Sequence, residues 1–310
     1  MIRTENVIKH FEDCVALKGV SCHIESGSIY GLVGSNGAGK STFLRLVSGV
    51  YQPDSGTILI DGEPVYDAPA VKNRMIFVPD EPYFLPGASL KRMAQMYESF
   101  YPGFDKERFH HLTESFRLSE TRSIHGFSKG MKRQAAILLA LSLRPDYYFF
   151  DETFDGLDPI MRKLVKGLIS EDVADRKATA IITSHSLREL EDLCDQLALL
   201  HEGGLILESD VSELKTSLFK VQIAFTDPFD ERAFQGLDVE NCEINGTVAQ
   251  LILRGDRESV MEELQAMDPV LLNMLPLNLE EIFTYELKER GYSFEEILEQ
   301  EARSDEKEDF

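Results

Sequence analysis

Residues 34 to 41 have the spacing G-x-x-x-x-G-K-S, which is a complete phosphate-binding loop. Glycines in such a loop adopt backbone angles closed to other residues, so amide N–H groups can approach phosphate oxygens closely. An apolar run precedes the loop and a helical stretch follows it. A phosphate-binding loop requires both flanking elements, whereas a glycine-rich turn that matches the spacing by chance does not. The residues expected to contact a nucleotide are Gly34, Ser35, Asn36, Gly37, Ala38, Gly39, Lys40, Ser41 and Thr42.

Two side chains at the end of this loop carry its chemistry. Lys40 is spaced to reach the β- and γ-phosphates, and Ser41 is spaced to offer its hydroxyl to Mg²⁺. The amino end of the helix that follows adds partial positive charge to the same site. The sequence therefore predicts a site for a nucleotide and Mg²⁺.

A second group of candidate residues lies at the end of the bulky apolar run from 147 to 150. Asp151 and Glu152 follow this run directly, as carboxylates do when a buried strand ends at a ligand crevice. Asp151 is suited to hold Mg²⁺ through water, and Glu152 to orient or deprotonate the attacking water in phosphoryl transfer. Taken alone, the pair is equally compatible with a strand followed by an acidic turn.

Three more segments complete an ordered set: residues 127–134 (FSKGMKRQ), 155–159 (DGLDP) and 181–185 (IITSH). Together with the phosphate loop and the acidic strand end, they resemble the motif set of ABC transporter ATPases. In that family they are the signature segment, the D-loop and the switch histidine. The motifs cover roughly the first two-thirds of the chain, and their common order makes coincidence an unlikely explanation.

The resemblance implies roles for further residues. Phe11 matches the aromatic side chain that stacks on adenine, although an aromatic core residue is the competing interpretation. Glu152 matches the catalytic glutamate, Asp151 the magnesium-linked aspartate, and His185 the histidine that contacts the γ-phosphate. The implied cofactors are ATP and Mg²⁺, and the implied activity is ATP hydrolysis.

The signature segment implies a dimer. Family members close two ATPase domains head to tail, so Ser128 and Gly130 would contact the γ-phosphate of the nucleotide that a second copy or a sister subunit holds. Asp158 would lie at the same interface. The partners that the resemblance implies are therefore a second ATPase subunit and membrane-spanning permease subunits.

The chain departs from the family pattern at a few positions. Lys129 and Met131 replace a glycine and a glutamine of the usual signature. Asp80 stands where the family has a glutamine that links the magnesium site to the membrane partner, and a carboxylate there is a candidate ligand for Mg²⁺. Thr153 replaces a proline. We expect retained but altered ATP-dependent closure.

The elements that must position these residues alternate between strand and helix, which indicates an α/β class. We expect a P-loop ABC-type core with an antiparallel β subdomain, starting from short strands before residue 33, and a helical insert at about 82–142. The predicted domains are an ABC ATPase domain at 1–212, a small α+β accessory domain at 213–292 and a disordered acidic tail at 293–310. In the accessory domain we expect strands at 221–225, 242–245 and 248–253, and helices at 258–267 and 279–288.

Composition limits the partners and the cellular location that the chain can have. The formal net charge is -22, which argues against nucleic acid as a partner. The four cysteines form no C-x-x-C pair, so we expect buried, reduced thiols. No signal peptide or apolar run of spanning length is expected. The predicted location is therefore cytoplasmic, at the inner face of the cell membrane through partner subunits.

These observations predict the ATP-binding subunit of an ABC transporter. The lysine-containing signature and the segment 276–283 (PLNLEEIF) resemble the branch that serves ABC-2-type exporters. Two alternatives stay open at this point. One is a soluble ABC ATPase that acts on ribosomes or DNA, and the other is a nucleotide-sensing regulator.

Overall fold

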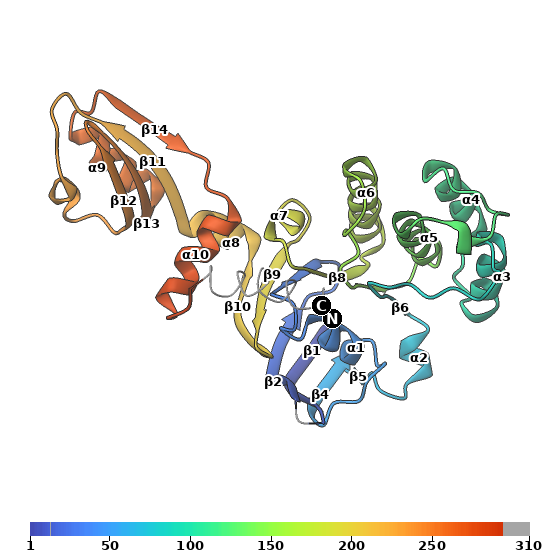
Figure 1. The fold of residues 1–310 in the computed structure, drawn as a ribbon. Helices are drawn as coiled ribbons and strands as arrows, with labels where there is room; N and C mark the ends of the chain where they lie inside the picture. The colour runs from blue at the N-terminus through green and yellow to red at the C-terminus, as the bar shows by residue number, and fades with distance from the viewer. Residues whose placement is uncertain (13, 294–310) are drawn as a thin grey trace, which may run out of the picture. The chain divides into compact units, whose positions relative to one another are not determined.

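The structure is a computed structural model, and it describes residues 1–12 and 14–293 (Figure 1). The chain divides between Glu208 and Ser209 into two compact units. The first unit is drawn in blue to yellow, and the second in orange to red. The domain boundary expected after residue 212 stays a prediction, and the expected acidic tail, Ser293 apart, lies outside the described residues.

A six-stranded sheet with the order β10-β9-β3-β8-β7-β6 forms the centre of the first unit. Its strands are β3 (Ile29–Val33), β6 (Met75–Val78), β7 (Tyr147–Phe150), β8 (Thr179–Ser184), β9 (Gln196–His201) and β10 (Gly204–Asp210). The pairs of β3 with β8 and β9, of β7 with β8, and of β6 with β7 are parallel. Every residue of β3, β7 and β8 is buried, as expected of parallel strands covered on both faces. Parallel pairing brings the carboxyl ends of β3, β7 and β8 to one edge.

Helices follow the strands that carry motifs. Helix α1 (Lys40–Val47) follows β3 and contacts β8, and α6 (Pro159–Arg176) also packs on β8. The short helix α7 (Leu187–Leu190) comes directly after β8. This order gives the strand, loop and helix arrangement that the phosphate loop requires.

A separate antiparallel sheet precedes and follows the phosphate loop in sequence, with the order β2-β1-β4-β5. Its strands are β1 (Ile2–Phe11), β2 (Cys14–Ile24), β4 (Ser55–Ile60) and β5 (Glu63–Pro64). The expectation of short strands at residues 1–33 is confirmed for β3 but was wrong for β1 and β2, which form one long hairpin. Register shifts along β1 break the strict apolar alternation by which a long strand is recognised in a sequence.

The helical insert contains α3 (Leu90–Phe100), α4 (Lys106–Ser115) and α5 (Lys129–Ser142), shown in green in Figure 1. A short helix α2 (Pro69–Lys72) and a 3₁₀ turn at Ile124–Gly126 precede α3 and α5 respectively. Each of these three helices begins with an N-cap side chain that accepts a hydrogen bond from a backbone N–H group: Ser89, Asp105 and Ser128. Both α3 and α4 pack against α5, which carries the signature segment.

The second unit contains a four-stranded sheet with the order β12-β13-β11-β14 and an apolar core. Its elements are α8 (Val211–Ser217), β11 (Leu218–Ala224), a 3₁₀ turn (Glu231–Phe234), β12 (Val239–Asn245), β13 (Val248–Arg254), α9 (Arg257–Ala266), β14 (Leu271–Leu275) and α10 (Leu279–Glu289). Three strands and two helices were expected, whereas α8 and β14 were not. The run that forms β14 has no polar alternation that would predict a strand.

Two of the cysteines do not fit the expectation of buried thiols. Cys22 and Cys194 are buried, but Cys14 is exposed and Cys242 is partly exposed, and all of them are free. Burial raises the pKa of the Cys22 thiol to about 12. Across residues 1–12 and 14–293, no helix is both long enough and apolar enough to cross a membrane.

Candidate nucleotide-binding site

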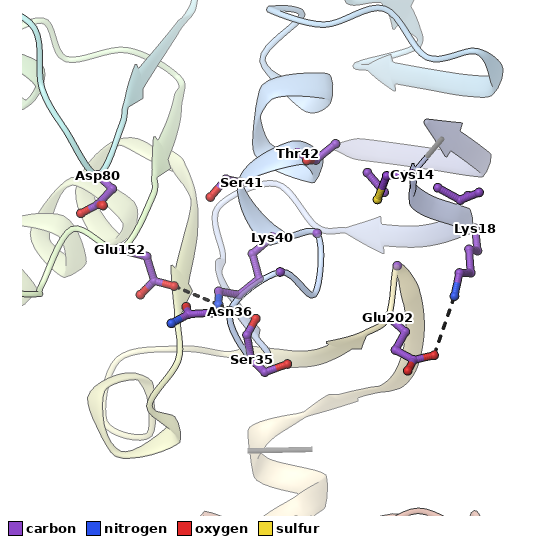
Figure 2. A pocket seen from close by; sticks show the side chains of 15 residues that line it. Cys14, Lys18, Ser35, Asn36, Lys40, Ser41, Thr42, Asp80, Glu152 and Glu202 are labelled. Atoms are coloured by element: carbon purple, nitrogen blue, oxygen red, sulfur yellow. Dashed lines mark hydrogen bonds and ion pairs between the residues drawn. The ribbon is translucent and has the colours of Figure 1, made fainter. Parts of the chain in front are cut away.

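A cavity of about 610 Å³ opens over the phosphate loop (Figure 2). Steric crowding explains two of the glycines there, because a Cβ on Gly34 would lie 2.3 Å from the carbonyl oxygen of Leu200. A Cβ on Gly39, whose φ is +108°, would lie 2.7 Å from the carbonyl oxygen of Ala16. The cavity is lined by Cys14, Val15, Ala16, Lys18, Ser35, Asn36, Gly37, Gly39, Lys40, Ser41, Thr42, Asp80, Glu152, Glu202 and Gly203.

Lys40 lines this cavity, although the residue is only 5% exposed. Its Nζ donates to the carbonyl oxygen of Gly34 at 2.6 Å and lies 3.0 Å from Oε1 of Glu152 (Figure 2). Burying a cation costs free energy, and the cost is greatest when the cation has no charged partner. The contact with Glu152 therefore joins the phosphate loop to the end of β7.

Ser41 and Asp151 come from different elements and meet beside the cavity. The Ser41 hydroxyl, in the first turn of α1, donates to Oδ1 of Asp151 at 2.9 Å, and the Thr183 hydroxyl of β8 donates to the same oxygen at 2.9 Å. Burial raises the pKa of the Asp151 carboxyl, and these two hydrogen bonds offset only part of that effect. The arrangement places hydroxyl and carboxylate oxygens next to the phosphate loop.

Glu152 adopts a left-handed backbone conformation with φ of +45°, which is unusual for a residue other than glycine. Its amide donates to the Thr183 hydroxyl at 3.0 Å, which fixes the turn. Burial would raise the pKa of the Glu152 carboxyl, but the hydrogen bond with His185 and the charge of Lys40 outweigh it, so the pKa is lowered. Glu152 is therefore ionised at neutral pH.

His185 follows β8 and faces the same turn. Its Nδ1 lies 3.2 Å from Oε2 of Glu152 and 3.9 Å from Oδ2 of Asp155. Burial raises the pKa of Asp155, as do the charges of Glu152 and Glu189, while His185 and Arg133 act against them. The predicted catalytic residues Lys40, Glu152 and His185 thus form one connected group.

Other predicted residues lie elsewhere. Phe11 is exposed, packs edge-on against Tyr51 with ring centroids 5.3 Å apart, and is not among the lining residues above. Ser128 and Asp158 are exposed at the amino ends of α5 and α6. Gly130 lies in the first turn of α5 and is partly exposed. The adenine contact of Phe11 and the dimer contacts of the other three stay predictions.

Sequence reasoning missed three residues that support this site: Thr183, Arg133 and Asp155. Each lies inside a motif that was recognised, at 181–185, 127–134 or 155–159, so membership of these motifs was the available signal. Their contacts depend on which strands are neighbours in the sheet. The spacing of the motifs does not reveal which strands are neighbours.

The family described as "ABC transporter" matches residues 17–155. The chain is also 33% identical over 283 residues to the ABC transporter ATP-binding protein YtrB of Bacillus subtilis, a match that covers 91% of this chain and 97% of YtrB. The chain belongs to the ABC transporter ATP-binding proteins. The Nod factor export ATP-binding protein I of Burkholderia lata is 31% identical over 288 residues, which cover 90% of this chain and 94% of that protein.

Solved structures of ABC cassettes share the fold. An ATP-binding subunit of an ABC transporter superposes with a TM-score of 0.64 and 26% identity over 69% of this chain and 92% of its own. The cassette MJ0796, solved as a dimer with ADP and Pi after hydrolysis, has a TM-score of 0.62 at 20% identity, over 68% of this chain and 99% of its own. The α/β P-loop ABC core expected from the sequence is confirmed. As a member of this family, the chain is the ATP-binding subunit of an ABC transporter and an ATP hydrolase.

Proposed function

We propose that this chain couples ATP-driven closure of an ATPase dimer to export through separate membrane-spanning permease subunits, which hold it at the inner face of the cell membrane. Relatives named for Nod factor export, and the 31% identical bacitracin transport ATP-binding protein BcrA of Bacillus licheniformis, support the export direction. The observation that carries the proposal is the connected group of Lys40, Glu152 and His185 at the cavity.

Hydrolysis follows from the charges of this group. The ionised Glu152 carboxylate accepts a proton from water as the water oxygen bonds to the γ-phosphorus and the bond to the leaving ADP oxygen breaks. Lys40 places positive charge where negative charge accumulates on the transferring phosphoryl group. His185 orients Glu152 through the 3.2 Å contact, and it would also contact the γ-phosphate of bound ATP.

Mg²⁺ fits the residues beside the phosphate loop. Ser41 and Asp151 supply a hydroxyl and a carboxylate oxygen that are already directed at one another, and this is the donor chemistry that a hard cation prefers. When bound, the ion would neutralise phosphate charge. Asp80, the third ligand expected from the sequence, lies at the wall of the same cavity, where its carboxylate is paired with Arg133.

A second ATPase subunit would complete the site. Ser128 and Asp158 are exposed at helix amino ends, and Gly130 is partly exposed beside Ser128, so all three are accessible to a nucleotide or a subunit that approaches from outside. Helix amino ends favour anions, which suits a γ-phosphate presented by the partner. Phe11 is accessible enough to stack on adenine.

The permease has a candidate docking area close to Asp80. Tyr83 is 76% exposed, and with Phe84 and Tyr97 it lines a groove between β6 and the helical insert. Exposed tyrosines are frequent anchors in protein interfaces. A membrane partner that contacts Tyr83 would be three positions along the chain from Asp80, which lines the nucleotide cavity.

Co-purification from detergent-solubilised native membranes, with a tag on this chain and mass spectrometry of the bound proteins, tests the proposal. We expect a polytopic membrane protein in stoichiometric amount. A Tyr83→Ser variant should recover less of it, whereas the control Tyr66→Ser, at an exposed tyrosine outside the groove, should not. Recovery of ribosomal proteins or nucleic acid in place of a membrane protein would contradict the proposal.

A further inference from the structure

Arg133 is a buried cation that the hydrolysis scheme above does not use. It lies in the second turn of α5 and is 3% exposed, although its side chain carries a permanent charge. A charge taken out of water at this depth requires a charged partner and several hydrogen bonds. The contacts of Arg133 therefore indicate what holds it there.

Those contacts come from two segments distant in sequence. Nη2 of Arg133 donates to the carboxylate of Asp80 and, at 2.8 Å, to the carbonyl oxygen of Asp80. Nη1 donates to the carbonyl oxygen of Asp155. A guanidinium can make all three contacts because its N–H groups form a planar fork, which a lysine ammonium lacks.

Both segments border the site of the proposed chemistry. Asp80 lines the nucleotide cavity, where Figure 2 shows it beyond Glu152 from the phosphate loop. Asp155 belongs to the turn that begins at Glu152, and its carboxylate lies 3.9 Å from Nδ1 of His185. Arg133 thus links the cavity wall to the backbone of the catalytic turn.

The turn lies close to the start of α5 around Arg133. A Cβ on Gly130 would lie 3.0 Å from the carbonyl oxygen of Gly156, and a Cβ on Gly156 would lie 3.6 Å from Nη1 of Arg133. The start of α5 and the turn are therefore in near contact. A change in the Asp80–Arg133 pair would be transmitted to the turn that carries Glu152.

We propose that Asp80 and Arg133 are positioning residues for hydrolysis. Asp80 holds the Arg133 guanidinium, which in turn holds the Asp155 carbonyl and so fixes the turn that presents Glu152 to the attacking water. In this chain the carboxylate of Asp80 acts on Arg133 and is not a ligand of Mg²⁺. The inference rests on the proposed ATP hydrolysis by Glu152.

The test is a double-mutant cycle in the full chain with Asp80→Asn, Arg133→Gln and the double variant. The readouts are kcat, KM for ATP, the Mg²⁺ concentration at half-maximal rate, and binding of a non-hydrolysable ATP analogue. We expect each single variant to lower kcat about tenfold and the double variant to lower it no further, because coupled residues are non-additive. KM, Mg²⁺ dependence and analogue affinity should stay within about twofold.

Two variants guard against a loss of folding. Asp80→Asn alters a side chain that is 47% exposed, so it should fold even if Arg133→Gln does not. The conservative Arg133→Lys keeps the charge but not the fork, and should recover only part of kcat. The control Glu81→Gln changes the exposed neighbouring carboxylate and should leave every constant unchanged.

Several results would overturn the inference. If Asp80→Asn raised the Mg²⁺ requirement more than about tenfold and excess Mg²⁺ restored kcat, Asp80 would be a metal ligand. Losses that multiply in the double variant would mean that the two residues act independently. Parental kcat in both single variants would remove the positioning role, whereas an unaltered chain without ATPase activity would instead contradict the proposed function.

Discussion

The first unit, residues 1–208, buries Lys40, Arg133, Asp151 and Asp172, whereas every buried residue described in the second unit is apolar. The charged pairs of the second unit, such as Lys220 with Glu281, lie partly exposed at its surface. Burying a charge costs free energy even when it is paired. The described core of the second unit therefore avoids this cost, while the first unit accepts it.

The location of the buried charges explains that cost. Three of the four lie within one network of contacts: Lys40 reaches Glu152, Asp151 accepts from Ser41, and Arg133 contacts Asp80 and Asp155. Charges fixed in a water-poor site interact strongly with charge that develops in a reaction. We therefore expect substitutions within this network to change catalysis, and substitutions in the core of the second unit to change stability.

The largest expected effect is at Lys40. Lys40→Met removes the cation that faces Glu152 and the phosphates, so we expect kcat/KM to fall about 10²- to 10³-fold in a steady-state ATPase assay. The control Lys91→Met, at an exposed lysine of α3, should change the value less than about twofold. A similar loss in both variants would mean that activity depends on the net charge of the protein and not on the position of Lys40.

A core substitution in the second unit should have the opposite pattern: it should lower stability and leave catalysis unchanged. Leu251 is fully buried in the apolar core, and Leu251→Ala should lower the free energy of unfolding of this unit by about 3 kcal/mol in urea titrations. The kcat measured without denaturant should not change. Leu271→Ala, at an exposed residue of β14, should cost less than about 1 kcal/mol. A large fall in kcat for Leu251→Ala would contradict the expectation that core substitutions in the second unit leave catalysis unchanged.

The smallest effect is expected at the surface of the second unit. Burial would raise the pKa of Glu281, but hydrogen bonds from Lys220 and the Asn278 amide outweigh it and lower the pKa. A lowered pKa stabilises the folded state above the unfolded-state pKa, and this stabilisation is lost as pH falls through the folded-state pKa. Glu281→Gln keeps the helix cap of α10, so it should cost about 0.5 kcal/mol at pH 7.

Urea titrations of the Glu281→Gln protein and the parent from pH 7 to pH 3 would check the sign. The difference in unfolding free energy should shrink as pH falls. A difference that grows toward low pH would show that the Glu281 carboxylate does not stabilise the fold through these contacts.

Much of the first unit could be predicted because its motifs depend on local spacing. The glycines around Lys40 and the apolar run before Asp151 each specify a strand end or a helix start within a few residues. The long β1–β2 hairpin could not be read this way, since its bulges interrupt the alternation. Strand β14 lacks the polar alternation of a surface strand.

For the site, residue types could be predicted from the motifs, but contacts between them could not. Glu152 and His185 were named from their motifs, yet their 3.2 Å contact depends on β7 and β8 being neighbours in the sheet. Asp80 was expected to face Mg²⁺, and its pairing with Arg133 could not be foreseen, because α5 approaches the end of β6 only in the folded unit. Long-range packing decides such contacts.

The most direct test of the account is the Glu152→Gln protein, measured for ATP binding and for turnover side by side. Gln keeps the shape of the side chain but cannot accept a proton, so we expect turnover to fall at least about 100-fold while ATP affinity stays within about threefold of the parent. Hydrolysis at the parental rate would contradict the assignment of Glu152 as the catalytic base.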